Sequence, residues 1–478
     1  MKNSRQDIKT ILQEGRLNTP VEVYGWVKTF RNDRFIVVND GSTLQNLQLV
    51  IEPAGFDENF LKKISTGAAV HARGELVKSL GKGQDVEVLV KDLEILGEAD
   101  PETYPIQPKK HSLEFLREKA HLRPRTTLFG AIMRIRSSLA FAVHEYFRKH
   151  GFLYINTPII TGIDAEGAGQ MFRVTTWEPG NIPLDEEGRP DYKKDFFGKK
   201  TNLTVSGQLE AETYAMALGK VYTFGPTFRA ENSNTTRHLA EFWMIEPEVA
   251  FMDLDGDMDL AEDFVKYIID FVMKNNAEDL AWLEKRLLDE EKRLPQNQRS
   301  ALPLRDKLQF VLDNHFVRIS YTEAIDILKK SKPAKKKKFQ FPPEWGMDLQ
   351  TEHERYLVEK HFKSPVIVYD YPADIKAFYM RMNEDGRTVR AMDVLFPGVG
   401  EIIGGSQREE RLDVLLEKME KMGISQEELW WYVDLRRYGT AFHSGFGLGF
   451  ERMVQFVTGM GNIRDVIPYP RYPKSAEF

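Results

Sequence analysis

The chain contains no cysteine among its 478 residues. This absence excludes a disulfide framework, a zinc site built from thiolates and a cysteine nucleophile. The chain also lacks an uninterrupted apolar run of about 18 residues, the length that a membrane-spanning helix requires, and its first ten residues are mostly polar. The sequence therefore predicts a cytoplasmic protein without a membrane segment and without zinc.

A strong net charge is also absent. The 66 Lys and Arg residues and the 72 Asp and Glu residues leave a formal charge of −6 at pH 7, so the chain is not a polycation that binds nucleic acid indiscriminately. One local exception is a lysine-rich run at 329–338. Such a run is usually a solvated loop, and a specific phosphate contact is the alternative.

Two glycine motifs that bind nucleotides are missing as well. No G-x-G-x-x-G follows an early strand, and no G-x-x-x-x-G-K-S/T is present. The sequence therefore argues against a Rossmann domain and against a P-loop domain. Any ATP chemistry requires another scaffold.

The N-terminal hundred residues have the pattern of a small β-barrel. Five short runs rich in Val, Ile and Phe alternate apolar and polar residues between 21 and 96, and turn residues such as Asn, Asp and Gly separate them. We expect residues 1–100 to form a closed barrel of the OB type. The prolines that follow indicate a hinge or linker at 101–126.

The remainder of the chain alternates helical and strand-like segments. Apolar residues recur at helical spacing from Thr127 to His150, and Gly151 is expected to end that helix. No repeat of 20 to 50 residues is present. The alternation predicts one large α/β domain over 127–478, with a mainly helical insertion at about 255–345.

The segment 222–250 carries the densest group of chemically capable residues. Two strand-like runs flank a polar loop, with Arg229 and Glu231 at the end of the first run and Phe242 in the second. An arginine placed there can bind a phosphate with two hydrogen bonds, and the ring of Phe242 offers a flat surface to a purine. A hairpin with exposed ion pairs is the structural alternative.

Two further segments contain candidate ligand-binding residues. Asp393 and Glu401 could share Mg²⁺ with substrate phosphates, and Arg408 could anchor a carboxylate or a carbonyl; a glycine-kinked strand leading into a charged helix is the alternative. In the segment 445–452, alternating glycines clear one face of a strand for a ligand or another backbone, and Arg452 follows at the start of an apolar helix.

In this order and spacing, the segments resemble motifs 2 and 3 of the class II aminoacyl-tRNA synthetases, and residues 151–158 resemble motif 1, whose helix and strand form the dimer interface in that class. The barrel, the hinge and the ending N-I-R-D-V-I-P at 462–468 resemble the subgroup for aspartate, asparagine and lysine. Over nearly the whole chain, notably at 404–411 and 434–439, the resemblance is to bacterial-type asparaginyl-tRNA synthetases. It implies an α+β fold in which residues 127–478 form a catalytic domain with an antiparallel sheet flanked by helices. It also implies ATP and L-asparagine as substrates, Mg²⁺ as cofactor, tRNA(Asn) as partner, and a homodimer.

The resemblance also implies roles for single residues. Arg229 would hold the α-phosphate, Phe242 would stack on adenine, and Arg452 would bind the other face of adenine or the γ-phosphate. Glu401 would ligate Mg²⁺ with Asp393 nearby. The residues implied at the remaining positions are Arg237 and His238 for the β- and γ-phosphates, Ser206 and Gln208 for the ammonium group of the amino acid, and Phe35 and Gln48 for anticodon bases. Phe35 could equally belong to the barrel core.

Asparagine is favoured over aspartate by the charges expected around the side chain of the substrate. Aspartate enzymes resemble this sequence but carry a lysine where Ala211 stands, so only Arg408 remains as a cation, and Glu231 is the candidate acceptor for the amide NH₂. Ala211 could also be a plain small helix residue. The rival interpretations are an aspartyl-tRNA synthetase with relaxed tRNA choice, a paralogue without catalysis and an ammonia-dependent asparagine synthetase.

Overall fold

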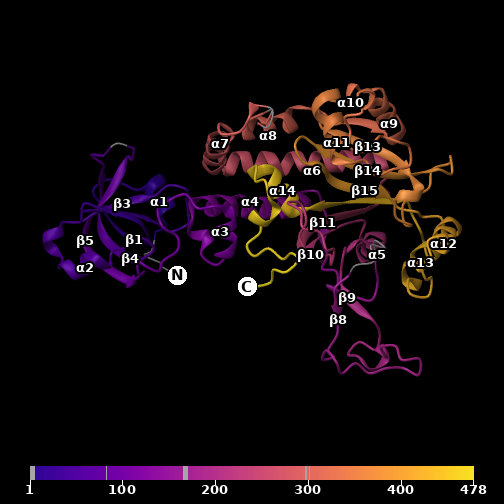
Figure 1. Ribbon diagram of the computed structural model, residues 1–478, viewed down its shortest axis with the longest axis horizontal. Coiled ribbons are helices and arrows are strands. Elements are labelled where there is room, and N and C mark those ends of the chain that lie inside the picture. The colour runs from indigo at the N-terminus through magenta and orange to yellow at the C-terminus, as the bar shows by residue number, and fades with distance from the viewer. Residues whose placement is uncertain (1–5, 82, 165–170, 297–298, 301) are drawn as a thin grey trace. The chain divides into compact units, whose positions relative to one another are not determined.

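The computed structural model describes residues 6–81, 83–164, 171–296, 299–300 and 302–478. The chain divides into two compact units, Met1–Met133 and Arg134–Phe478. The first unit contains β1 to β5, and the second contains a large sheet with its covering helices (Figure 1). Among the helices of the described residues, none has the length and the apolar character that crossing a bilayer demands.

The first unit is built around a closed five-stranded barrel in the order β1-β2-β3-β5-β4, which confirms the predicted OB-type barrel. The strands are β1 (Thr19–Arg31), β2 (Phe35–Asn39), β3 (Leu47–Val50), β4 (Ala69–Lys78) and β5 (Val86–Gly97). Burial alternates along β2 as the period-two pattern predicts. In β2, Ile36 and Val38 are fully buried in the barrel core, whereas Phe35 and Val37 are only partly buried.

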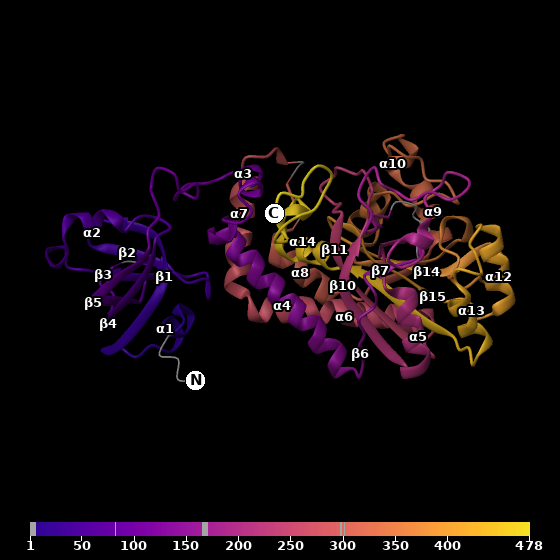
Figure 2. The same ribbon diagram turned by 90° about the horizontal axis from the view of Figure 1, so that it is seen from below.

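Two short helices, α1 (Ile8–Glu14) and α2 (Glu58–Lys63), accompany the barrel (Figure 2). Ile8 and Ile11 of α1 belong to its core. The predicted hinge segment 101–126 is not extended throughout, because it includes the helix α3 (Leu113–Glu118). The hydroxyl of Ser112 accepts a hydrogen bond from the backbone N–H of Phe115 at 3.2 Å and so caps this helix.

The second unit contains an eight-stranded sheet in the order β12-β13-β14-β15-β16-β11-β10-β6. Neighbouring strands are antiparallel except for the two outermost pairs, β12 with β13 and β6 with β10, which are parallel. The strands are β6 (Leu153–Tyr154), β10 (Lys220–Phe228), β11 (Glu241–Ala250), β12 (Val317–Ser320), β13 (Val366–Pro372), β14 (Thr388–Phe396), β15 (Gly400–Gln407) and β16 (His443–Gly449). The predicted antiparallel sheet thus carries a parallel strand at each margin.

The long helix α4 (Thr127–Lys149) matches the predicted helix, and Gly151 follows it with a φ of +78°. In the second unit it packs against α6 (Leu254–Asn275), as Figure 2 shows: the Tyr146 hydroxyl donates to Asp263 at 2.6 Å, and the rings of Phe147 and Phe264 have centroids 4.8 Å apart.

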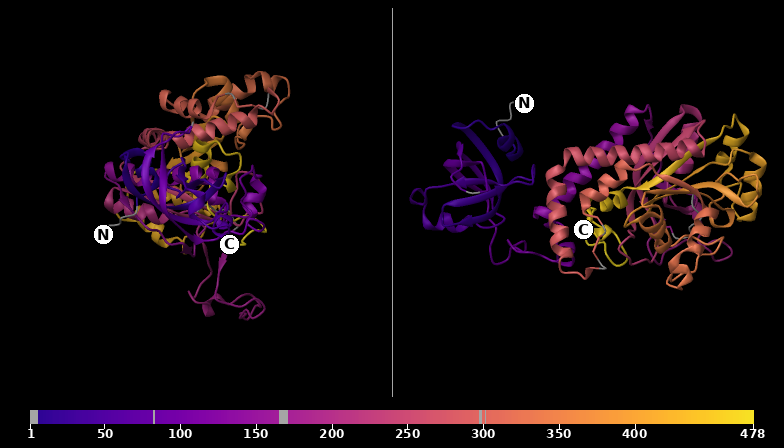
Figure 3. Two further views of the ribbon diagram at one scale, coloured as in Figure 1. Left: turned by 90° about the vertical axis from the view of Figure 1, so that its left-hand side faces the viewer. Right: turned by 90° about the horizontal axis from the view of Figure 1, so that it is seen from above.

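The predicted insertion consists of α6, α7 (Ala277–Glu291), α8 (Leu304–Asp313), α9 (Tyr321–Lys330) and α10 (Lys332–Lys335), and β12 adds its strand to the sheet. Helix α6 contacts β14, β15 and β16, so this part of the insertion covers the sheet (Figure 3).

A small sheet of β7 (Ile160–Thr161), β9 (Thr201–Leu203) and β8 (Arg173–Val174) stands beside the large one. The chain between β8 and β9 extends away from the large sheet as an arm, at the bottom of Figure 1. After β9 the chain enters α5 (Gln208–Leu218), whose first turn follows Ser206.

Candidate active site

The predicted strand–loop–strand unit is present as the antiparallel pair β10 and β11, with Thr227 opposite Phe242. Arg229 follows β10 directly, and its backbone N–H donates to the carbonyl oxygen of Ala240 at 3.0 Å. The guanidinium carbon of Arg229 lies 5.4 Å from the centre of the Phe242 ring. An anion-binding group and a flat aromatic surface therefore stand side by side, as the sequence predicts.

All seven residues predicted to contact ATP line one cavity of about 190 Å³. The seven are Arg229, Glu231, Arg237, His238, Phe242, Glu401 and Arg452. Gly447 and Gly449 of β16 line the same cavity, so the alternating glycines do leave one face of that strand open. Arg452 belongs to α14 (Phe450–Thr458), and its Nη1 donates to the carbonyl oxygen of Glu401 at 3.0 Å.

Carboxylates gather at one side of this cavity. Asp393 of β14 and Glu401 of β15 lie within their strands and flank Gly404: a β-carbon on that glycine would stand 3.6 Å from Asp393 Oδ1 and 3.4 Å from Glu401 Oε1. Lys376 Nζ lies 3.1 Å from Asp393 Oδ2. Sequence analysis missed a third carboxylate, Glu354, which accepts a hydrogen bond from the Glu401 backbone N–H at 3.3 Å.

The electrostatics of this group fit a divalent cation. Burial raises the pKa of Glu354 to about 8, and the charges of Glu401 and Asp393 add to the effect. Burial also raises the pKa of Glu401, with Asp393 contributing and Arg452 opposing. Carboxylates that repel one another beside a cavity lined by arginines have the oxygen donors that Mg²⁺ prefers.

Ser206 and Gln208 lie at the start of α5, as the resemblance requires, and they meet acidic residues that sequence analysis missed. The Ser206 hydroxyl donates to Glu246 Oε1, and the Glu246 carboxylate also accepts from the backbone N–H of Gly207 at 3.1 Å and from the Thr223 hydroxyl at 2.9 Å. Glu246 is buried. A buried carboxylate next to Ser206 is a suitable counter-ion for an ammonium group.

Arg408 follows β15 and is buried with only 3% of its surface exposed. Its Nε and Nη2 donate to the two carboxylate oxygens of Glu248 at 2.9 and 2.8 Å, and its Nη1 donates to the Ser406 hydroxyl at 2.8 Å. Burial alone would lower the pKa of Arg408, but Glu248 holds it above its usual value. The charge of Arg408 is thus already balanced by a partner within the fold.

Glu212 of α5 accepts hydrogen bonds from side chains of several elements in this region. Its carboxylate accepts hydrogen bonds from Gln208 at 3.1 Å, Tyr432 at 3.0 Å, Arg436 at 3.0 Å and His443 at 2.9 Å. Burial would raise the pKa of Glu212, but Arg436, and then the hydrogen bond from His443, hold it below its usual value. Sequence analysis missed this residue as well.

Glu212, Glu248 and His443 are close enough together to hold a metal ion. The carboxylates already accept from Arg436 and Arg408. A metal ion would have to displace these guanidinium groups, so we interpret the trio as part of a buried polar network.

The two residues predicted to contact the side-chain amide of asparagine, Glu231 and Arg408, lie in different surroundings. Glu231 lines the cavity of about 190 Å³, whereas the guanidinium of Arg408 is bound to Glu248 and Ser406. Ala211 is fully buried and packs with Ala215, Val221 and Ile155. Its contacts are those of a small residue between helix and sheet, which agrees with the structural alternative for Ala211.

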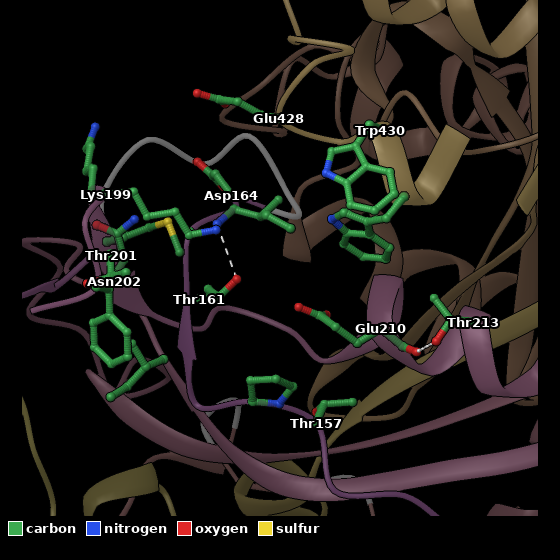
Figure 4. Close-up of a pocket in the computed structure, with 18 of the residues that line it drawn as sticks. Thr157, Thr161, Asp164, Lys199, Thr201, Asn202, Glu210, Thr213, Glu428 and Trp430 are labelled. Atoms are coloured by element: carbon green, nitrogen blue, oxygen red, sulfur yellow. Dashed lines mark hydrogen bonds between the residues drawn. The ribbon is translucent and has the colours of Figure 1, made fainter. Parts of the chain in front are cut away.

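A larger cavity of about 940 Å³ lies between the segment from Ile155 to Asp164, β9 and the segment that precedes α13 (Trp430–Arg437). Figure 4 shows Lys199 at one side of this cavity, Trp430 at the other and Glu210 of α5 below. Burial raises the pKa of Glu210 to about 7, with contributions from Glu246 and Glu212. The site residues predicted from sequence do not line this cavity.

The predicted anticodon-binding residues lie on the barrel. Phe35 is absent from the hydrophobic core cluster that contains Ile36 and Val38, so the core interpretation of Phe35 is not supported. Gln48 pairs with Val37 across β2 and β3, and its side chain donates to Glu87 at 3.0 Å. Because Phe35 and Val37 share a face of β2, Phe35 and Gln48 lie on the same side of the sheet.

Comparisons with known proteins agree with this geometry. Residues 112–473 match the family model described as tRNA synthetases class II (D, K and N), and residues 21–96 match an OB-fold nucleic acid binding domain. The chain is 57% identical to an asparagine–tRNA ligase of Cytophaga hutchinsonii, over 99% of this chain and 100% of the relative. It is 55% identical to an asparagine–tRNA ligase of Porphyromonas gingivalis, over 100% of this chain and 99% of the relative.

Solved structures agree as well. The crystal structure of asparaginyl-tRNA synthetase from Pyrococcus horikoshii complexed with asparaginyl-adenylate matches with a TM-score of 0.83 and 32% sequence identity, covering 100% of both chains. The family model spans β10, β11, the carboxylates Glu354, Asp393 and Glu401, and Arg408. Together, the architecture, the cavity and the full-length similarity establish that this chain belongs to the class II tRNA synthetases of the D, K and N group.

Proposed function

We propose that this chain joins L-asparagine to tRNA(Asn) in two steps, with asparaginyl-adenylate as the intermediate and with pyrophosphate and AMP as products. The observation that carries the proposal is the cavity of about 190 Å³, here called the nucleotide cavity, which Arg229, Arg237 and Arg452 line together with Phe242. Full-length relatives named asparagine–tRNA ligase support the choice of substrate.

In the first step the carboxylate of asparagine attacks the α-phosphate of ATP, and pyrophosphate leaves. Phe242 stacks on adenine while Arg229 stabilises the charge that gathers on the α-phosphate. Arg237, His238 and Arg452 bind the β- and γ-phosphates. The nucleophile is already ionised, so positioning and charge stabilisation replace a general base.

Asp393 and Glu401, with Glu354 beside them, would hold Mg²⁺. The raised pKa values of Glu354 and Glu401 support this assignment, because burial and the neighbouring carboxylates both disfavour their ionised forms, and a bound cation would offset that cost. When bound, Mg²⁺ neutralises charge on the phosphate oxygens of ATP.

The amino acid is selected by charge balance. Ser206 and Gln208 bind its ammonium group, and the carboxylate of Glu246 next to Ser206 supplies the counter-charge. Arg408 donates to the amide oxygen, and Glu231 accepts from the amide NH₂. Because Glu248 already balances the charge of Arg408, an aspartate side chain would bring an unpaired negative charge into a buried site.

In the second step the 3′-OH of the terminal adenosine of the tRNA takes the asparaginyl group from the adenylate. The barrel of residues 1–100 binds the anticodon through Phe35 and Gln48, where unpaired bases stack on aromatic rings. Residues 101–126 link this domain to the catalytic domain of residues 127–478. The active form is a homodimer.

The test is ATP–pyrophosphate exchange with asparagine and with aspartate in parallel, without tRNA. Exchange with asparagine alone is expected. Exchange with aspartate would overturn the charge-balance argument at Arg408 but leave the chemistry standing. If no exchange were measured with either amino acid, the proposed activity would be overturned.

A further inference from the structure

A basic cavity of about 810 Å³ adjoins the nucleotide cavity. Its walls come from α8, the turn between β14 and β15, the C-terminal end of α14, and the π-helix η5 (Tyr356–Phe362). Arg237 lines this cavity and the nucleotide cavity alike. The two spaces therefore meet on the side where the β- and γ-phosphates of ATP are proposed to lie.

Positive charge dominates the described lining residues. The cations are Arg237, Arg299, Lys307, Arg355, Lys360 and Lys363. The one carboxylate among these described lining residues, Glu359, already accepts from Arg355 Nε at 2.9 Å and from the Gly398 backbone N–H at 3.0 Å. The negative charge of Glu359 is therefore already paired with Arg355 and does not balance the other cations of the cavity.

The positive charge of Lys307 is balanced by little negative charge in the cavity. Its ammonium lies 4.6 Å from the centre of the Phe456 ring, and burial lowers its pKa to about 8, with Glu291 opposing. Within the described part of the chain, no carboxylate lies within ion-pair distance of the ammonium groups of Lys307, Lys360 and Lys363. A polyanion entering the cavity would supply the missing negative charge.

Arg237 links the cations of the two cavities. Burial lowers its pKa, and repulsion from Arg452 and Arg355 contributes. Its Nη1 donates to the Thr351 hydroxyl at 3.0 Å. Arg452 in the nucleotide cavity and Arg355 in the basic cavity therefore both act electrostatically on Arg237, and positive charge continues from one cavity into the other.

We propose that the basic cavity binds inorganic pyrophosphate as it leaves the nucleotide cavity, with Lys307, Lys360 and Lys363 as ligands. This inference rests on the proposed function, because adenylate formation is the step that releases pyrophosphate. The adenylate keeps the α-phosphate at Arg229, while the departing product carries several negative charges past Arg237. A cavity with excess positive charge on that side retains this product and gives it a path that does not cross the adenylate.

The test is a variant in which the three lysines are neutralised together, Lys307→Met, Lys360→Gln and Lys363→Gln. Methionine keeps the packing on Phe456 without the charge. In ATP–pyrophosphate exchange with asparagine, the KM for pyrophosphate is expected to rise about tenfold, while the KM values for ATP and asparagine stay within about twofold. Inhibition of adenylate formation by added pyrophosphate should weaken in parallel.

The matched control neutralises three lysines of the run at 329–338, Lys332→Gln, Lys336→Gln and Lys338→Gln, which do not line the cavity. It should leave the KM for pyrophosphate unchanged. An unchanged KM in the cavity variant, or an equal rise in the KM for ATP, would overturn the proposal. So would a rise confined to the KM for tRNA, which would assign the lysines to the nucleic acid backbone. If the unaltered chain exchanges nothing with asparagine, the proposed function itself fails.

Discussion

At the scale of single residues, the buried ion pair of Arg408 and Glu248 is the place where the proposed selection of asparagine can be tested. Deleting the guanidinium would leave Glu248 buried without a partner, which costs about 3–5 kcal/mol in comparable pairs. Arg408→Lys keeps a positive charge for Glu248 but loses the planar set of donors. We expect the KM for asparagine to rise about tenfold, which corresponds to about 1.4 kcal/mol of lost binding.

Steady-state pyrophosphate exchange measures this effect when asparagine and ATP are varied separately. The KM for ATP should stay within about twofold, because Arg408 does not line the nucleotide cavity. A matched control is Arg411→Lys, since Arg411 pairs with Glu409 in the same segment. Equal increases in both KM values for Arg408→Lys would show that Arg408 does not bind the amino acid.

Glu210 predicts a pH-dependent change in stability. Burial raises its pKa from 4.5 to about 7 in the folded chain, so the folded state binds the proton more tightly than the unfolded state. The free energy of unfolding therefore falls as the pH rises from 4.5 through 7. Glu210→Gln removes the cost of ionisation and should raise the free energy of unfolding by about 2 kcal/mol at pH 8.

Denaturant unfolding at pH 5 and pH 8 would measure this difference. At pH 5, where the carboxyl is mostly protonated in the folded chain, the variant should have nearly the stability of the unaltered chain. Glu428→Gln is the control, because Glu428 lines the same cavity but is exposed. A stabilisation of the Glu210 variant that is equal at both pH values would contradict the electrostatic cause.

Single residues also show where prediction from sequence ends. The seven residues that line the nucleotide cavity could be named together because they lie in three segments whose order and spacing resemble the motifs of a known family. Glu246 and Glu248 could not be assigned, since their partners Ser206 and Arg408 lie 40 and 160 residues away. A signal was nevertheless present: two glutamates at positions i and i+2 of a buried strand share one face and require partners there.

At the scale of elements, β2 allows a function of the barrel surface to be separated from a function of its core. Phe35→Ala should leave the melting temperature nearly unchanged, because Phe35 lies outside the core cluster. It should lower kcat/KM for tRNA charging by about tenfold, since stacking on one base contributes about 1–3 kcal/mol. Pyrophosphate exchange without tRNA should be unaffected.

The neighbouring substitution Ile36→Ala is the matched control. Ile36 is fully buried, so its truncation should lower the free energy of unfolding by about 2–5 kcal/mol. Thermal unfolding and tRNA charging measured on both variants would separate the two effects. If Phe35→Ala lowered stability as much as Ile36→Ala without affecting charging, Phe35 would be a structural residue.

The long helices and strands could be predicted from the periodic spacing of their apolar residues. The barrel strands and α4 have regular patterns over enough residues to be recognised. Short margin strands such as β6 and β12 carry too few residues for a pattern and form only because a neighbouring strand pairs with them. The arm between β8 and β9 has no periodicity, so its course could not be predicted.

At the scale of the whole molecule, an apolar surface predicts self-association. The segment 151–158, which resembles motif 1, and the two residues after it expose Leu153, Tyr154, Ile159 and Ile160 by 40–49%. Grouped exposure of large apolar side chains indicates an interaction surface. This segment also reaches the active site, because the Thr204 backbone N–H donates to the carbonyl oxygen of Ile159 at 2.8 Å, two residues before Ser206.

We therefore expect the chain to sediment at twice its mass of 55.2 kDa and to depend on that assembly for activity. Ile159→Asp should shift sedimentation to the single-chain mass, because it places a charge in an apolar interface, and pyrophosphate exchange should fall with it. Leu288→Asp, at an exposed apolar position of α7, is the matched control and should leave both properties unchanged. An unaltered chain that sediments as a monomer would remove the homodimer from the proposed function. If the Ile159→Asp chain remained a dimer, the interface would lie elsewhere. If that dimer had lost its exchange activity, the substitution would act locally on Thr204 and Ser206.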